Sequence, residues 1–258
     1  MTDQTKYPSL KNKTVFITGG ATGIGAAMVR AFSEQGAKVA FVDLAGDAAL
    51  KLATNIEQRT GERPWFRQLD ITNTTTLQSA IRDATSVLGR LHTLVNNAAN
   101  DMRHAPVDVT PESWRNTMAI NLDATFFAAQ TAAELMAKKD SEQGGSIINF
   151  SSINALLGPT NMPGYVAAKA AIIGLTKSLA KEFGGSNVRV NAILPGWVVT
   201  QKQLETWLTP DAEAAWMEQV ALKKRLLPTD VANLALFLAA DDSTMITGQS
   251  LTIDGGRT

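Results

Sequence analysis

The chain has 258 residues, of which 45% are hydrophobic and 19% are charged, and 24 basic side chains balance 24 acidic ones. This is the composition of a globular protein with one well-buried core, and without a basic block it gives no reason to expect nucleic acid or a membrane surface as a partner. The absence of cysteine excludes thiol chemistry, and two histidines leave little for a metal site, so no metal is expected.

The first ten residues are polar and lack the apolar segment of a signal peptide, and no run approaches the length of a membrane span. These features predict a cytoplasmic protein.

A βαβ unit is predicted next along the chain. Residues 13–18 (KTVFIT) form a short strand, which is followed by a glycine cluster. A helix is predicted over residues 24–35, and residues 38–42 form the second strand. Strands joined in this way are parallel and buried on both faces.

The alternation of strand and helix continues along the chain. Further strands are predicted at residues 64–69, 93–95, 146–150, 188–193 and 250–253. Further helices are predicted at residues 48–59, 75–88, 111–139, 164–183, 210–221 and 230–239. Residues 1–258 are therefore expected to form one α/β domain of Rossmann type, a doubly wound parallel seven-stranded sheet with helices on both faces. Ligands bind at the carboxyl ends of the strands in such folds, and the irregular segment 197–222, with three tryptophans, is predicted to be a substrate lid.

The glycine cluster, residues 18–25 (TGGATGIG), predicts a nucleotide site. Its spacing is looser than the common G-x-G-x-x-G, but it follows the first strand and opens a helix. Glycines at that place let the backbone approach a pyrophosphate, whose charge is stabilised by the free N–H groups of the helix N-terminus. The alternative is a glycine-rich turn without a ligand, and the βαβ context favours the nucleotide.

Asp43, at the end of the second strand, indicates which nucleotide. A carboxylate there can accept hydrogen bonds from the ribose hydroxyls of NAD and would repel the 2′-phosphate of NADP. Leu44 and the two residues after it provide no cation that would neutralise that phosphate. NAD is therefore favoured over NADP, although Asp43 can also cap the next helix.

Tyr165 and Lys169 are the first candidates for chemistry. Residues four apart lie on one face of a helix, so the lysine ammonium can come close to the tyrosine hydroxyl. A nearby cation favours the phenolate, which can then act as an acid or base near neutral pH. An ordinary helix pair is the alternative, and the presence of Ser152 thirteen residues before Tyr165 argues for the catalytic interpretation.

A set of motifs in fixed order along the chain resembles the short-chain dehydrogenase/reductase family over nearly its whole length. The motifs are residues 18–25, Asp43, Asp70-Ile71, residues 96–99 (NNAA), Asn121, Ser152, Tyr165, Lys169 and Pro195-Gly196. This resemblance implies an oxidoreductase. It also implies a homotetramer formed through the helices at 111–139 and 164–183 and the last strand.

The resemblance assigns four catalytic residues. Tyr165 is the acid/base, and Ser152 hydrogen-bonds the reacting oxygen. Lys169 lowers the tyrosine pKa and holds the nicotinamide ribose. Asn121 anchors a water that links Lys169 to solvent.

The cofactor-binding residues implied by the resemblance follow the carboxyl ends of the strands. They are Gly19, Thr22, Gly23, Ile24, Gly25, Asp43, Leu44, Asp70, Ile71, Asn97, Ala98, Ala99, Tyr165, Lys169, Pro195, Gly196, Val198 and Thr200. Asp70 and Ile71 are expected to flank the adenine. Ala99 stands where the family usually has glycine, which adds only a methyl group beside the cofactor.

Within the family, the loops at residues 7–11, 100–104 and 200–210 resemble those of bacterial NAD-dependent sugar 1-dehydrogenases of the D-xylose type. These enzymes oxidise an aldose at C1 to a lactone. Sugar hydroxyls lose water on binding and need polar partners. The substrate candidates are Asn100, Arg103, His104, Ser152, Asn154, Tyr165, Trp197 and Gln201, with Asp101 and Gln203 as further polar candidates. Surface or packing roles are the alternative for Arg103, His104, Asn154 and Trp197.

Other functions remain open at this point. A dehydrogenase of another small polyol, sugar acid or secondary alcohol would use the same Ser-Tyr-Lys set. A 3-oxoacyl carrier-protein reductase is disfavoured, because such enzymes usually need NADPH and Asp43 opposes it. A non-catalytic NAD-binding sensor has no need of an acid/base tyrosine, so the complete catalytic set argues against it.

Overall fold

The computed structural model describes residues 5–137 and 144–258. Its centre is a seven-stranded sheet in the order β3-β2-β1-β4-β5-β6-β7, and every neighbouring pair is parallel. The strands are Thr14–Thr18 (β1), Lys38–Asp43 (β2), Trp65–Gln68 (β3), Leu91–Asn96 (β4), Gly145–Phe150 (β5), Val188–Pro195 (β6) and Ser250–Ile253 (β7). The strand order runs outward in both directions from β1 and β4, so their carboxyl ends flank the switch point at which ligands bind.

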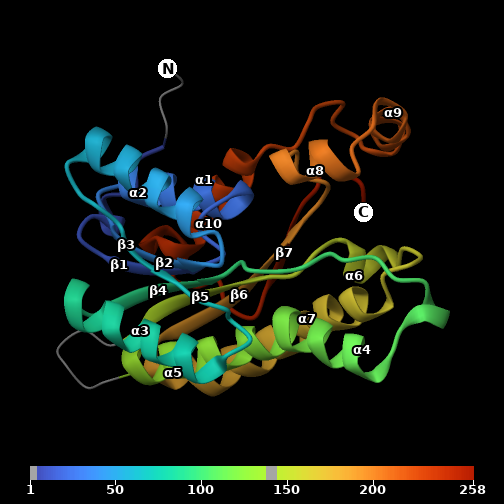
Figure 1. Ribbon diagram of the computed structural model, residues 1–258. Helices are drawn as coiled ribbons and strands as arrows, with labels where there is room; N and C mark the ends of the chain where they lie inside the picture. Colours follow the sequence, from blue (N-terminus) through green and yellow to red (C-terminus); the bar gives the residue numbers. More distant parts are fainter. Residues whose placement is uncertain (1–4, 138–143) are drawn as a thin grey trace.

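Helices cover both faces of the sheet (Figure 1). One layer contains α1 (Gly23–Glu34), α2 (Gly46–Thr60) and α10 (Pro228–Ala239). The other contains α3 (Thr74–Leu88), α5 (Ala124–Met136) and α7 (Pro163–Phe183). The predicted single-domain, doubly wound α/β fold is confirmed.

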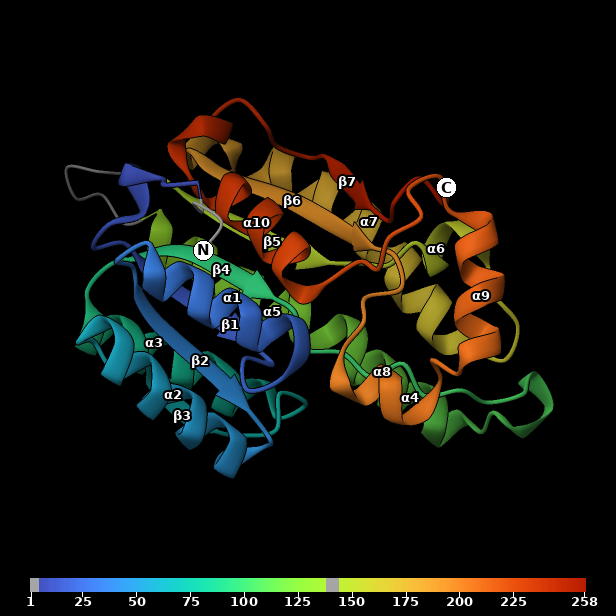
Figure 2. The same cartoon turned by 90° about the horizontal axis from the view of Figure 1, so that it is seen from above.

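Four short helices lie toward the carboxyl ends of the strands (Figure 2). They are α4 (Pro111–Met118), α6 (Asn154–Leu157), α8 (Gln201–Thr206) and α9 (Pro210–Gln219). Between β6 and α10 only one helix was expected, at residues 210–221. The structure adds α8, which begins where the Thr200 hydroxyl accepts a hydrogen bond from the Gln203 N–H (3.3 Å). Six residues are too few to show a helical period, which is why the pattern did not predict it.

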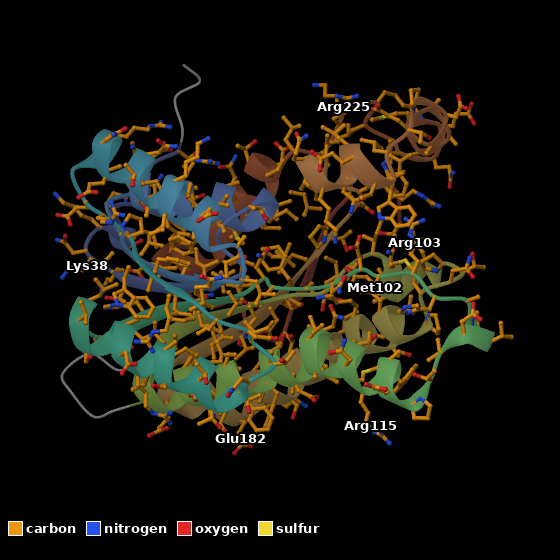
Figure 3. All side chains as sticks on the ribbon, viewed as in Figure 1. Lys38, Met102, Arg103, Arg115, Glu182 and Arg225 are labelled. Atoms are coloured by element: carbon orange, nitrogen blue, oxygen red, sulfur yellow. The ribbon has the colours of Figure 1, made fainter. Side chains whose placement is uncertain are left out.

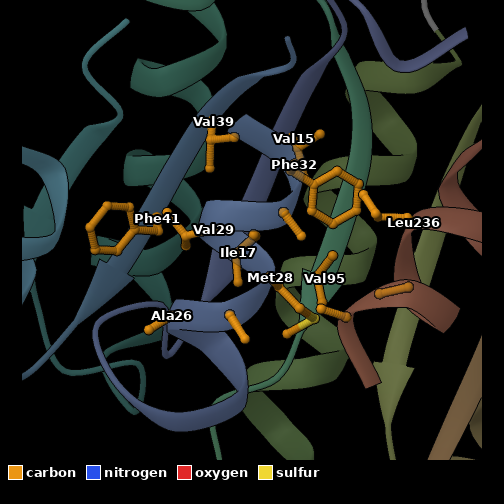
Figure 4. Packing of buried hydrophobic residues seen from close by; sticks show 14 of the residues in the cluster. Val15, Ile17, Ala26, Met28, Val29, Phe32, Val39, Phe41, Val95 and Leu236 are labelled. Carbon is orange, nitrogen blue, oxygen red and sulfur yellow. The ribbon is translucent and has the colours of Figure 1, made fainter. Parts of the chain in front are cut away.

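The core is divided by the sheet, because successive side chains of a strand point to opposite faces. Val15 and Ile17 of β1 belong to the cluster that contains Phe32 of α1 (Figure 4). Phe16, between them, belongs to the second cluster with Ile81 of α3. All of these side chains are fully buried, which explains why the central strands are continuous apolar runs without alternation.

The helix predicted over residues 111–139 is interrupted. α4 ends at Met118, a π-helical turn spans Ala119–Asp123, and α5 begins at Ala124. Its start is capped as predicted: Thr110 and Ser113 exchange side-chain and backbone hydrogen bonds, and proline occupies the first position. The expected end near Lys139 lies outside the described residues.

Several further bounds differ from the sequence prediction by one or two residues. β4 begins at Leu91 instead of residue 93, and α10 begins at Pro228, where the Asp230 carboxylate accepts a hydrogen bond from the Leu227 N–H (2.8 Å). Across residues 5–137 and 144–258, no helix combines the length and apolar character needed to cross a membrane.

Candidate active site

A cleft of about 1020 Å³ opens at the carboxyl ends of the strands. Strand order places Asp43, at the end of β2, and Asp70, after β3, on one side of the cleft. It places Ser152, after β5, and Pro195, at the end of β6, on the other side. Every residue predicted to bind cofactor or substrate, or to act in catalysis, lines this cleft except Asn121 and His104. Side chains that are far apart in the sequence therefore meet in one site.

The glycine loop packs tightly against the end of β4. A Cβ on Gly25 would lie 1.8 Å from the Gly19 carbonyl oxygen, and Gly19 has φ +66°. The Asn97 amide donates to the carbonyls of Thr18 (3.1 Å) and Gly19 (2.9 Å), which fixes the loop. Thr22 precedes α1 without a side-chain cap, so its hydroxyl does not occupy the first N–H groups of that helix. This loop fits a pyrophosphate, which needs a close backbone and free N–H donors.

Asp43 supports two segments at once. Its carboxylate accepts hydrogen bonds from the backbone N–H of Ala21 (2.8 Å) and of Ala45 (2.9 Å). It therefore braces the glycine loop and the turn before α2, and each oxygen keeps capacity to accept another bond from a ribose hydroxyl. The basic residues of the described cleft lining, Arg103, Lys169 and Lys202, all follow β4 or later strands and not β2.

Ser152 and Lys169 are both held by backbone groups. Ser152 is buried, and its hydroxyl oxygen accepts the Asn154 N–H (3.1 Å). Lys169 is 2% exposed, and its Nζ donates to the Phe150 carbonyl (2.8 Å). Burial disfavours the charged amine and lowers the pKa of Lys169 to about 7.

Tyr165 lies between these two residues and the loop after β4. Burial raises the pKa of Tyr165 to about 12, a hydrogen bond with Ser152 opposes that rise, and the negative charge of Asp101 adds to it. The Lys169 nitrogen lies 5.6 Å from the centroid of the tyrosine ring. The lysine is thus beside the ring and bonded to Phe150. Tyr165 keeps its proton at neutral pH unless further positive charge or hydrogen-bond donation reaches its hydroxyl.

Asn121 does not reach the cleft and instead supports it from behind. It is 1% exposed in the π-helical turn, and its amide donates to the carbonyls of Asn100 (3.1 Å) and Thr117 (3.0 Å). Its Oδ1 accepts the Asn100 N–H (3.0 Å). The wider turn thus aims this side chain at the loop after β4, in keeping with the frequent use of π-turns at functional sites.

The loop after β4 is tied to the segment 197–222 by side chains. The Asp101 carboxylate accepts hydrogen bonds from Lys202 Nζ (2.6 Å) and Gln203 Nε2 (3.0 Å) of α8. The Arg103 guanidinium carbon lies 3.9 Å from the centroid of the Trp207 ring. In Figure 3 Arg103 is seen between this loop and the helices α8 and α9, whereas Arg225 lies on their outer side.

Two tryptophans form part of the cleft wall. The Trp197 indole N–H donates to Gln203 Oε1 (2.7 Å), and its ring meets Trp216 edge to face, with centroids 5.6 Å apart. Trp216 lines the cleft as well. No sequence pattern indicated this, because the position depends on the packing of Trp216 against Ala192 and Leu194 of β6.

His104 lies outside the cleft. Its backbone N–H donates to the Asn161 carbonyl (2.8 Å), and its side chain borders a separate pocket of about 10 Å³ that Tyr165 also borders.

Sequence reasoning missed several residues that line the main cleft: Asn116, Ile120, Pro159, Thr160 and Met162. The spacing of Asn116 and Ile120 could have indicated one shared helix face. Among the described residues, no three His, Cys, Asp or Glu side chains gather as a metal site would require.

This fold and cleft are those of a dinucleotide-binding dehydrogenase. A family model described as "Enoyl-(Acyl carrier protein) reductase" matches residues 19–258. A solved short-chain type dehydrogenase/reductase from Mycobacterium ulcerans superposes with a TM-score of 0.91 at 30% identity, covering 96% of this chain and 90% of that one. The chain therefore belongs to the short-chain dehydrogenase/reductase family of oxidoreductases, which bind a nicotinamide cofactor.

Individual relatives are similar over nearly their whole length. The protein named "Probable galactose dehydrogenase GalD" of Rhizobium meliloti is 46% identical over 251 residues, 97% of each chain. The D-xylose 1-dehydrogenase of Caulobacter vibrioides is 40% identical over 250 residues, again 97% of each. A blue fluorescent protein from a metagenomic library, solved in complex with NADPH, has a TM-score of 0.87 at 31% identity, covering 97% of this chain and 99% of that one.

Proposed function

We propose that this protein is an NAD-dependent dehydrogenase that oxidises an aldose at C1 to the lactone. The observation that carries the proposal is the meeting of Ser152 and Tyr165 in one cleft with Trp197, Trp216 and several uncharged polar side chains. That combination suits a neutral polyhydroxyl substrate. The relatives named for galactose and D-xylose support the same substrate class.

The proposed reaction needs a base for the C1 hydroxyl. Ser152 accepts a hydrogen bond from Asn154, and its own O–H, which is shared with Tyr165 in this structure, donates to the reacting oxygen when substrate binds. Tyr165 takes the hydroxyl proton. The bound nicotinamide supplies the acceptor for the hydride from C1.

Lys169 is the residue that makes Tyr165 a base in this proposal. The Phe150 carbonyl uses one N–H of its charged amine and leaves the others for the ribose hydroxyls of the cofactor. Hydrogen bonds to those hydroxyls stabilise the charged amine, and a charged Lys169 favours the phenolate. Asn121 acts through Asn100 and through the water that the resemblance assigns to it.

NAD is the cofactor in this proposal. Asp43 lies where the adenosine ribose is expected, and the charged side chains near it in the cleft lining are acidic. A 2′-phosphate there would meet a carboxylate without a compensating cation. The relative solved with NADPH means that the choice has to be measured, with both cofactors in parallel.

The sugar is held, in this proposal, by Asn100, Asn154 and Gln201 at its hydroxyls. Aromatic rings bury the apolar C–H face of a sugar well, and Trp197 is held for that task by Gln203 and Trp216. Segment 197–222, called the lid below, closes over the site. The homotetramer and the cytoplasmic location stay predictions.

A screen for NADH formation tests the proposal. Pentoses, hexoses, 6-deoxyhexoses, polyols and sugar acids are each offered with NAD and with NADP. Aldoses with NAD are expected to give the highest kcat/KM, whereas turnover of polyols, sugar acids or secondary alcohols alone would replace the proposal with the alternative. Tyr165→Phe should abolish turnover and leave NAD binding intact; undiminished turnover would overturn the role of Tyr165, and no turnover of any substrate by the wild type would favour an NAD-binding sensor.

A further inference from the structure

Asp101 occupies an unusual place between the lid and the catalytic tyrosine. Its carboxylate lines the same cleft as Tyr165, and its side chain is 25% exposed. Both of its side-chain partners, Lys202 and Gln203, belong to α8 of the lid. A movement of α8 away from the cleft would therefore leave the carboxylate without either partner.

The backbone just before Asp101 is held independently of the lid. Asn100 is bonded by Asn121 from behind, whereas the Arg103 side chain is stacked on Trp207 of the lid. Asn121 therefore keeps the negative charge of Asp101 beside the cleft, and the lid brings the positive charge to it. The Lys202–Asp101 distance of 2.6 Å is that of a charge-assisted hydrogen bond.

We propose that the Asp101–Lys202 ion pair couples docking of the lid to the charge that faces the catalytic tyrosine. With α8 docked, Lys202 offsets part of the negative charge of Asp101. With α8 withdrawn, the lone carboxylate opposes formation of a second negative charge on Tyr165. Asp101 and Lys202 are thus positioning residues that favour the phenolate only when the site is closed. The inference rests on the proposed role of Tyr165 as a base.

The other charges near Tyr165 do not duplicate this arrangement. The titratable side chains of the two pockets that it borders are Asp43 and Asp70 on the adenosine side, Lys169 of α7, His104, Arg103, Asp101 and Lys202. Lys169 is fixed within α7 and bonded to Phe150, and Arg103 is engaged with Trp207. Of these groups, Lys202 is the cation that the lid carries to an acidic partner. With the ion pair formed, the negative charge of Asp101 still raises the pKa of Tyr165, so loss of Lys202 should strengthen that effect.

The pH dependence of kcat/KM with the aldose found in the screen tests the coupling. Lys202→Gln keeps a hydrogen-bond donor and removes the charge. The apparent pKa of the base in the pH profile is therefore expected to rise by about one unit. Asp101→Asn should lower this apparent pKa. The double variant Asp101→Asn/Lys202→Gln should resemble Asp101→Asn, because no carboxylate remains for Lys202 to neutralise.

A matched control exists on the far side of the lid. Arg225 pairs with Glu213 of α9 (2.7 Å for the Nη2–Oε2 contact), and neither residue lines the cleft. The side-chain exposures of this pair, 52% and 21%, are close to the 58% and 25% of Lys202 and Asp101. Arg225→Gln should leave the pH profile unmoved. If Arg225→Gln shifted the apparent pKa as much as Lys202→Gln does, any loosening of the lid would change the ionisation of the base. That result would contradict the inference.

A second measurement does not depend on turnover. The chain has two tyrosines, Tyr7 and Tyr165, so in a Tyr7→Phe background the phenolate absorbance reports Tyr165 alone. At a fixed alkaline pH, Asp101→Asn should increase the phenolate fraction and Lys202→Gln should decrease it. Equal fractions in all variants would overturn the inference. Should the wild type oxidise no substrate, the proposed function fails, whereas this titration still reports whether the ion pair acts on Tyr165.

Discussion

Asn121 and Asn100 hold each other by two hydrogen bonds. The Asn100 N–H donates to Asn121 Oδ1 (3.0 Å), and Asn121 Nδ2 donates to the Asn100 carbonyl (3.1 Å). The π-helical turn between α4 and α5 supplies the wider backbone that aims Asn121 at this loop. The loop carries Asp101 and Arg103 to the lid, so the two asparagines connect the helix behind the site with the segment that covers it.

Replacement of Asn121 by Leu should therefore destabilise the protein. The substitution leaves the partly buried N–H and C=O of Asn100 without their partner in Asn121, which should lower the free energy of unfolding by about 1 to 3 kcal/mol. Urea unfolding measures the change. Asn116→Ala is the control, because the Asn116 side chain lines the cleft without a hydrogen bond to the described part of the chain. Equal stability of the two variants would contradict the bracing role of Asn121.

Gly25→Ala should disrupt the nucleotide loop. The added Cβ would lie 1.8 Å from the Gly19 carbonyl oxygen and 2.9 Å from the Asn97 amide nitrogen, so the backbone has to shift. The Kd for NAD should rise by roughly tenfold or more, since the loop can no longer approach the pyrophosphate. Isothermal titration calorimetry measures it. Gly185→Ala, where no described atom beyond the chain neighbours lies within 4 Å of the new Cβ, should keep wild-type affinity.

Much of this arrangement follows from local sequence patterns. The strands alternate with helices, parallel strands bring their carboxyl ends to one edge, and motifs such as residues 18–25 and Asp43 lie directly at those ends. The last strand, Ser250–Ile253, has the predicted bounds. Local patterns were sufficient because each of these features is set by residues close in the chain.

Other features could not be predicted, because they depend on long-range contacts or on backbone detail. Asp101 and Lys202 are 101 residues apart in the sequence and meet only through the fold. The π-helical turn at Ala119–Asp123 interrupts no apolar period, so the pattern reads as one helix. The partner of Lys169 is a backbone carbonyl, at Phe150, which no side-chain motif reveals.

Cofactor preference should change with the charge beside Asp43. Asp43→Asn combined with Leu44→Arg removes a carboxylate and adds a cation at a residue that lines the cleft and is 66% exposed. The ratio of kcat/KM for NADP to that for NAD should rise by roughly tenfold or more. Asp43→Asn with Leu50→Arg is the control, since Leu50 is 52% exposed on α2 but does not line the cleft. An unchanged ratio in the first variant would contradict the proposed ribose contact.

Stability should depend on pH through Lys169. Burial lowers its pKa from 10.5 to about 7, so between these values the unfolded chain binds more protons than the folded protein. The free energy of unfolding of the apoprotein therefore gains a contribution that rises with pH over that interval, by at most about 1.4 kcal/mol per pH unit. Lys169→Met should remove this rise in urea unfolding series.

The exposed Lys177, on the same helix, provides the control for that series, and Lys177→Met should keep the rise. A stability curve of Lys169→Met parallel to that of the wild type would contradict the buried, neutral lysine.

Tyr165 has the opposite effect on stability at higher pH. Its pKa is raised from 10.0 to about 12, so its contribution to stability is complete below pH 10 and is lost as the pH rises through 12.

Trp207→Ala should loosen the lid without touching the cofactor site. The substitution removes the ring that stacks on Arg103 at 3.9 Å, a contact between the lid and the loop after β4, while Trp207 does not line the cleft. A cation above an exposed ring contributes about 0.5 to 1 kcal/mol, so KM for the sugar should rise about two- to fivefold with an unchanged Kd for NAD.

Trypsin should also cleave the Trp207→Ala variant faster than the wild type at Lys202, Lys223 and Lys224. Trp114→Ala is the control, since Trp114 is 39% exposed against 37% for Trp207 and lies on α4, outside segment 197–222. NAD is expected to slow cleavage within the lid of the wild type, and equal cleavage with and without NAD would contradict closure of segment 197–222 over the bound cofactor.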